Sequence, residues 1–148
     1  MAASKDPYIY FDQVGHLLRK AYQRHAAIFQ KVIPDSDLTA AQLVTLCAVR
    51  EQPGRSLNEI VKVTAIDQAT IRGVVDRLKA RKLVEISSDP EDGRKSLVNM
   101  TKDGEKLLDK TIPFAHEVTD LTYGNLSPGE RVALQYLLKK MIDASPDM

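Results

Sequence analysis

Apolar residues recur at helical spacing towards both ends of the chain. From Tyr8 to Val32 they alternate at intervals of three and four, which predicts one long helix. Its stripe consists of Phe11, Val14, Leu18, Ala21, His25, Ile28 and Val32 and is interrupted by a polar residue only at His25. The same spacing returns from Thr101 to about Tyr123 and from Pro128 to about Asp143. Pro113 should kink the helix that contains it, because proline removes a backbone donor and clashes with the preceding turn.

Side chains that cap helix N-termini mark where the helices begin. Three pairs have the spacing of a capping box, in which two side chains satisfy each other's free backbone N–H groups: Thr39 with Gln42, Ser56 with Glu59, and Ser127 with Glu130. Asp67 can cap the helix that follows it. Asp6 before Pro7 predicts that the first helix starts at that point.

The middle of the chain combines short helices with a β-hairpin. A helix that ends at Pro53-Gly54 is followed by one from Ser56 to about Val63 and, after a turn, by one from Asp67 to about Arg81. Residues 84–88 and 96–100 then alternate at period two on either side of a polar turn. This order predicts a mainly α fold with a small β-wing, that is, a winged helix-turn-helix.

The helix from Asp67 to Arg81 has the composition of a helix that enters the major groove of DNA. Opposite its apolar face lie small residues that permit a close approach, and Gln68 and Arg72 can each make two hydrogen bonds to a base edge. The cations at the hairpin tip are suited to a phosphate or the minor groove. The predicted DNA contacts are Ser56, Gln68, Ala69, Thr70, Arg72, Gly73, Arg77, Arg94 and Lys95.

The overall charge does not by itself indicate a nucleic-acid partner, because the 148 residues carry a net charge of only +1. Between Arg72 and Lys82, however, five basic residues stand against the single acid Asp76. A charged helix face is often only solvated surface. The hairpin that follows, with two cations at its tip, favours double-stranded DNA as the partner.

Other sequence features bear on the compartment. The N-terminal residues lack the apolar stretch of a signal peptide, and the longest run without charge, from Leu38 to Val49, is too short to span a bilayer. The single cysteine, Cys47, excludes an internal disulfide and suits a reducing compartment. We therefore expect a cytoplasmic protein.

Two segments resemble a known family. The stretch from Asp89 to Gly104 is similar to the wing signature of the MarR family, in which Asp92 and Arg94 would be paired, and the stretch from Ile71 to Val84 resembles the recognition helix and its exit. Lys82 stands where members of the family usually carry glycine, at a helix end that favours a left-handed backbone, and Met100 replaces a leucine. The resemblance covers the whole chain.

The resemblance implies a homodimeric transcriptional repressor. One domain would span residues 1–148, with the winged helix-turn-helix at 39–101 and dimerisation helices at 7–33 and 101–144. Two recognition helices would read the half-sites of a pseudo-palindromic operator. The family mostly represses transcription, although an activator would have the same fold.

The family also implies an effector. Its members respond to small ligands, often phenolic or aromatic carboxylates, which bind between the winged domain and the dimerisation helices and release the DNA. Residues 16–22 are similar to the corresponding segment of members that control aromatic-acid catabolism. Arg19 is the expected partner of a ligand carboxylate, with His16 and Gln23 beside it. The alternative is that these are ordinary surface or interface residues.

Other residues raise further functional possibilities. Cys47 is a candidate oxidant sensor, but its neighbours Leu43 and Leu46 predict a buried thiol with a raised pKa. The histidines His16, His25 and His116 lack metal-ligand spacing, so no metal and no cofactor are expected. No phosphate-binding loop or nucleophile motif predicts an enzyme. A ligand-independent regulator and a module that binds only proteins stay open as alternatives.

Overall fold

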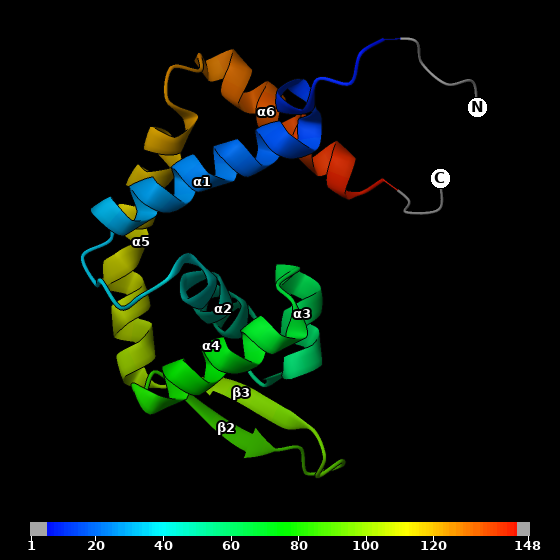
Figure 1. The fold of residues 1–148 in the computed structure, drawn as a ribbon. Helices are drawn as coiled ribbons and strands as arrows, with labels where there is room; N and C mark the ends of the chain where they lie inside the picture. The colour runs from blue at the N-terminus through cyan, green and yellow to red at the C-terminus, as the bar shows by residue number, and fades with distance from the viewer. Residues whose placement is uncertain (1–5, 145–148) are drawn as a thin grey trace.

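The computed structural model describes residues 6–144, which contain six α-helices and a small sheet. Residues 1–5 and 145–148, which include most of the segment considered for a signal peptide, lie outside the described residues. Figure 1 shows a winged unit connected to an arm of three helices, as the predicted fold class requires. The elements are η1 (Tyr10–Asp12), α1 (Val14–Val32), α2 (Ala40–Glu51), β1 (Arg55–Ser56), α3 (Leu57–Thr64), α4 (Gln68–Ala80), β2 (Val84–Ser88), β3 (Ser96–Met100), α5 (Lys102–Tyr123) and α6 (Pro128–Ile142).

Helix caps form at four of the predicted starts. Thr39 and Ser127 each make the full reciprocal capping box. Asp67 accepts the backbone N–H of Thr70, as predicted. Ser56 caps α3 through the N–H of Glu59, but the Glu59 carboxylate accepts the Ser56 hydroxyl, so this pair is a cap rather than a reciprocal box.

The predicted start of the first helix is wrong. Instead of a helix that begins at Asp6 and Pro7, a single 3-10 turn, η1, precedes α1, and Gln13 between them is extended with φ −77° and ψ 144°. The Gln13 side chain donates to the Ile9 carbonyl over 3.0 Å. The aromatic and β-branched residues of 8–11 are weaker helix formers, so capping chemistry alone does not extend the helix to this point.

The winged unit has a continuous core between α2, α3, α4 and the sheet. The side chains that are fully buried there include Leu46, Ile60, Ile71, Leu78 and Val98. The expected apolar face of α4 is buried as predicted, which fixes the opposite face toward solvent. The hairpin of β2 and β3 gains a third strand, β1, which the sequence pattern did not predict, and the strand order is β1-β3-β2.

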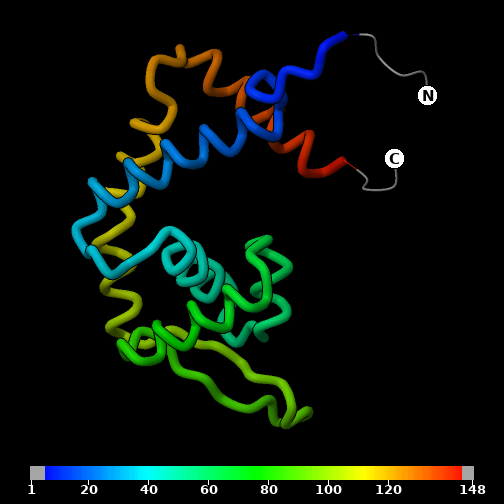
Figure 2. The backbone as a smooth tube through the Cα atoms, in the orientation of Figure 1, coloured from blue at the N-terminus to red at the C-terminus, as the bar shows by residue number. Residues whose placement is uncertain are grey.

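The arm consists of α1 packed along α5, followed by α6. Arg24 of α1 donates to the Leu121 carbonyl of α5 over 2.7 Å, and His25 contacts the Thr122 hydroxyl over 3.0 Å. Pro113 does not end α5, which continues for ten residues beyond it. Figure 2 shows that α6 folds back towards the N-terminal part of α1. No residue of α6 is buried within the described part of the chain.

Candidate DNA interface and effector cleft

The exposed face of α4 carries most of the predicted DNA contacts. Gln68, Ala69, Thr70, Arg72 and Arg77 are all exposed, and Gly73 between them is half-buried. A Cβ added at Gly73 would lie 3.3 Å from the Arg77 guanidinium, so this side chain folds back along its own helix. The centre of this face therefore carries small residues, and cationic side chains flank it.

Asp67 holds the N-terminal turn of this helix. Its carboxylate accepts the backbone N–H of Thr70 over 2.9 Å and the Thr70 hydroxyl over 2.7 Å. These bonds lower the pKa of Asp67 below its ordinary value of 3.8, because they stabilise the charged form. The Thr70 hydroxyl is therefore engaged in the cap, whereas Gln68 in the same turn has its side chain exposed to solvent.

The wing tip presents its cations to solvent. The Arg94 side chain is 94% exposed, and Asp92 beside it accepts the Arg94 backbone N–H over 3.1 Å. The Asp92–Arg94 pair that the family resemblance implied is thus present, with its Nε and Oδ1 atoms 3.5 Å apart. Lys95 is also exposed, and its backbone closes the tip through bonds with Asp89 and Asp92.

Ser56 must be withdrawn from the predicted DNA contacts. Its side chain is buried, with 7% of the residue exposed, and its hydroxyl is already bonded to Glu59. The cause is the unpredicted strand β1, which pairs Ser56 with Leu97 of the wing. Its neighbour Arg55 is buried too and donates to the Ala48 carbonyl over 2.7 Å.

The C-terminal end of α4 is joined to the start of α5. Lys82 has the left-handed φ of 61° expected at this position, and the chain then turns into β2. The Thr101 hydroxyl donates to the Lys82 carbonyl over 2.7 Å. Gly104 of α5 packs directly on the Leu83 carbonyl, and a Cβ added at Gly104 would lie 2.1 Å from the carbonyl oxygen. The first turn of α5 therefore packs backbone to backbone against the turn that follows α4.

A second attachment of α4 was not apparent from the sequence. Arg81, the C-cap residue of α4, donates to Asp35 in the loop between α1 and α2 over 2.6 Å. The other Asp35 oxygen accepts the backbone N–H of Asp37 over 3.0 Å. Partial burial raises the pKa of Asp35, but the bonds from Arg81 and Asp37 outweigh it, so the net shift is downward.

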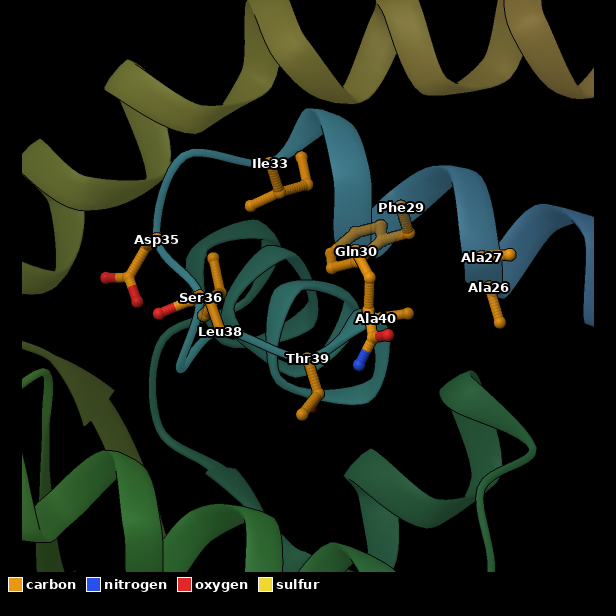
Figure 3. A pocket seen from close by; sticks show the side chains of 10 residues that line it. All are labelled: Ala26, Ala27, Phe29, Gln30, Ile33, Asp35, Ser36, Leu38, Thr39 and Ala40. Atoms are coloured by element: carbon orange, nitrogen blue, oxygen red, sulfur yellow. The ribbon is translucent and has the colours of Figure 1, made fainter.

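A cleft of about 580 Å³ lies where α1 meets α2. Figure 3 shows that α1, the loop that follows it and the start of α2 all contribute side chains to this cleft. Its lining is mixed, with apolar groups from Phe29, Ile33 and Leu38 and polar groups from Gln30 and Thr39. This is the boundary between the arm and the winged unit, where the family resemblance placed the effector.

The predicted effector residues do not line this cleft, but they continue its α1 wall. His16, Arg19 and Gln23 share a helix face with Ala26 and Gln30, because these residues recur at intervals of three and four. Arg19 and Gln23 are exposed, and His16 is half-buried with its ring edge-on to Tyr10, 5.5 Å between centroids. An α-helix rises about 1.5 Å per residue, so Arg19 lies roughly 10 Å along α1 from Ala26.

A second cleft, of about 410 Å³, lies between α1, α5 and α6 and is mostly apolar. Its walls include Leu18 and Tyr22 from α1, Tyr123 from α5 and Leu134 from α6. Apart from Val44 and Val63, every large apolar side chain that is exposed in residues 6–144 belongs to the arm or to the segment before α1. This concentration of apolar surface distinguishes the arm from the winged unit.

Cys47 is not buried, contrary to the prediction. It lies on the outer face of α2 with Val44 and Glu51, while Leu43, Leu46 and Val49 are buried in the core. Partial desolvation nevertheless raises the pKa of the thiol, as expected, although Arg50 opposes the shift. A thiol of raised pKa is a weak nucleophile at neutral pH, which argues against oxidant sensing at Cys47.

Within residues 6–144, no group of three side chains is arranged to hold a metal ion. None of the helices in that part of the chain is long and apolar enough to cross a membrane. The histidines of α1 instead make the ring and hydroxyl contacts described above.

Comparison with known proteins agrees with the geometry. A model of the MarR family matches residues 36–95, which cover most of the winged unit. The HTH-type transcriptional repressor NicR of Pseudomonas putida is 57% identical over 138 residues, which are 93% of this chain and 87% of NicR.

Two solved structures extend the comparison to the whole fold. A structure of BpsR from Bordetella bronchiseptica, whose DNA binding is regulated by 6-hydroxynicotinic acid, has 61% sequence identity and a TM-score of 0.89, and the match covers 95% of this chain and all of that one (100%). A mutant of MarR from E. coli, complexed with operator DNA, has 27% identity and a TM-score of 0.81 over 91% of this chain and 99% of that one. The chain therefore belongs to the MarR family of winged helix-turn-helix transcriptional regulators and is not an enzyme.

Proposed function

We propose that this protein is a homodimeric, cytoplasmic transcriptional repressor that leaves its operator when it binds a small aromatic carboxylate. The observation that carries the proposal is the cleft between α1 and α2, because it lies where the arm meets the winged unit that carries the helix suited to the major groove. A ligand in this position touches both parts of the molecule.

The DNA-binding part of the proposal rests on α4 and the wing. Gln68 and Arg72 are exposed near the N-terminal end of α4, where recognition helices meet base edges. Arg77 flanks the same face, and Ala69, Thr70 and Gly73 permit a close approach. Arg94 and Lys95 extend from the wing tip and are suited to the minor groove or a phosphate.

The dimer rests on the arm. A monomer rarely exposes large contiguous apolar patches. Here Val14, Leu17, Leu137 and Ile142 are all more than half exposed. A second copy of the chain that covers these side chains would also place two α4 helices for a pseudo-palindromic operator.

The chemistry of the effector follows from the relatives. BpsR responds to 6-hydroxynicotinic acid, a small aromatic carboxylate, and the high identity makes the same compound the first effector to test. The described lining of the cleft contains the carboxylate of Asp35 but no cation. The exposed Arg19, on the continuation of the α1 wall, is the cation that we assign to the ligand carboxylate, with His16 and Gln23 as polar neighbours.

The experiment measures binding to the DNA upstream of the protein's own gene by fluorescence anisotropy, with and without 6-hydroxynicotinic acid. We expect nanomolar binding at low salt and a loss of affinity of at least tenfold with the acid. Arg19→Ala should keep the DNA affinity and lose the response. Lys20→Ala, one residue further along and on another face of α1, is the matched control and should respond like the wild type.

Two results would contradict the proposal separately. Absence of DNA binding at low salt would contradict the proposal that the protein represses its own promoter. A normal response in Arg19→Ala would reject the assigned carboxylate partner while leaving the repressor intact.

A further inference from the structure

The loop between α1 and α2 contacts both the cleft and the recognition helix. Ile33 and Leu38 anchor its ends in the core, with 5% and 3% of each residue exposed. Between these anchors, Asp35 and Ser36 line the cleft. The Asp35 carboxylate points outward in Figure 3, away from Ile33, and binds Arg81 at the end of α4.

This ion pair is a direct link from the cleft to the DNA-reading helix. Asp35 and Arg81 are 46 residues apart in the chain, and their side chains are only 21% and 34% exposed. Arg81 also takes part in the C-terminal turn of α4, where its backbone N–H donates to the Arg77 carbonyl over 3.1 Å. A displacement of Asp35 therefore acts on the end of a helix rather than on a free side chain.

We propose that the Asp35–Arg81 ion pair transmits effector binding from the cleft to the recognition helix. The inference rests on the proposed function, since it assumes that the effector occupies the cleft between α1 and α2. A ligand couples two sites only if its contacts differ between two states of the protein. Here the ligand contacts the loop, and the loop holds Arg81 in one of these states.

The geometry of Asp35 suits such a coupling role. One carboxylate oxygen fixes the loop by accepting the Asp37 N–H, and the other accepts the Arg81 guanidinium. A ligand that moves the loop thus moves the acceptor of Arg81 with it. At the same end of α4, Thr101 and Gly104 hold the following turn against α5, so Arg81 lies between a backbone contact and an ion pair.

Measuring the coupling between acid binding and DNA binding, rather than affinity alone, tests this role. The coupling factor is the ratio of operator Kd values with and without saturating 6-hydroxynicotinic acid, and the affinity of the free protein for the acid is measured by calorimetry. Asp35→Asn keeps an oxygen that can accept the Asp37 N–H but removes the charge. We expect it to lower the coupling factor about fivefold and to change the affinity for the acid less than twofold.

A matched control and a double-variant cycle separate this role from a general structural one. Asp109→Asn removes another ion pair, between Asp109 of α5 and Arg50 of α2, which touches neither the loop nor α4. It should leave the coupling factor unchanged. Arg81→Gln should lower the coupling factor as Asp35→Asn does, and the double variant should lower it no further, because both changes break the same contact.

The possible results are distinguishable. An unchanged coupling factor in Asp35→Asn, or a double variant whose loss is the product of the two single losses, overturns the inference while wild-type release still supports the proposed function. Failure of the acid to weaken wild-type DNA binding overturns the proposed function, and this inference with it.

Discussion

At the scale of single residues, Gly104 shows how closely the two halves of the molecule are joined. It lies in the first turn of α5, where its N–H donates to the Thr101 hydroxyl over 3.0 Å. The Leu83 carbonyl occupies the position that a side chain would need. Because this neighbour is backbone, it cannot rotate away as a flexible side chain would.

We expect Gly104→Ala to lower the free energy of unfolding by about 2 kcal/mol or more, since overpacking against backbone forces α5 away from the turn that follows α4. Chemical denaturation monitored by circular dichroism measures the change. Gly129→Ala is the matched control, because Gly129 also lies in the first turn of a helix but has nothing within 4 Å of an added Cβ. Equal stability of the Gly104→Ala variant and the wild type would contradict the close contact.

At the scale of elements, helix starts were predictable from sequence where the interactions that create them are local. The caps at Thr39, Ser127 and Asp67 each involve partners three residues apart, so the motif contains the whole interaction. The apolar face of α4 and the two strands of the wing were equally accessible to pattern analysis. The recognition helix was therefore predicted almost completely.

The errors arose where distant segments decide the outcome. Pairing of β1 with β3 buries Ser56, and no pattern within residues 55–56 indicates that pairing. Cys47 occupies a helical face that looked apolar, but the core lies on the other sides of α2. The Asp35–Arg81 pair joins the loop after α1 to the C-cap of α4, 46 residues further along the chain, and carries no sequence motif. The local pattern of apolar and polar residues does not indicate non-local contacts of this kind.

The cap of α4 has a pH dependence that can be checked. The pKa of Asp67 is lowered on folding, so its contribution to stability is complete above its ordinary value of 3.8 and is lost as the pH falls through the lower folded value. We expect the stability difference between the wild type and Asp67→Ser to be larger at pH 6 than at pH 3. Urea denaturation at the two pH values measures it.

A control for this prediction comes from an uncharged cap. Thr39 caps α2 through its uncharged hydroxyl. The stability difference between the wild type and Thr39→Ser should therefore be the same at pH 6 and pH 3. If the stability difference between the wild type and Asp67→Ser were larger at pH 3 than at pH 6, the predicted direction of the pH dependence would be wrong.

At the scale of the whole molecule, the arm exposes apolar side chains that a single chain leaves uncovered. Leu137 of α6 is 53% exposed, and α6 buries no residue within residues 6–144. We expect Leu137→Asp to shift the protein from dimer to monomer and to lower the operator affinity at least tenfold, because a charge in an apolar interface is costly and a monomer reads only one half-site. Sedimentation equilibrium measures the first effect, and fluorescence anisotropy the second.

Val63→Asp is the matched control for oligomeric state. Val63 is equally exposed, at 53%, but lies on α3 in the winged unit, outside the arm. This variant should stay a dimer. A dimeric Leu137→Asp would contradict the assignment of α6 to the interface.

The length of α5 bears on how the protein can dissociate from DNA. Its 22 residues form a rod of roughly 33 Å that begins beside the end of α4 and reaches the turn before α6. If its α6 end is held by the arm, a tilt of about 5° moves the other end by about 3 Å. Successive base pairs are about 3.4 Å apart, so this small rotation displaces the reading helix by nearly one base pair. A rod of this length would thus convert a slight angular change in the arm into a displacement of nearly one base-pair step at the winged unit.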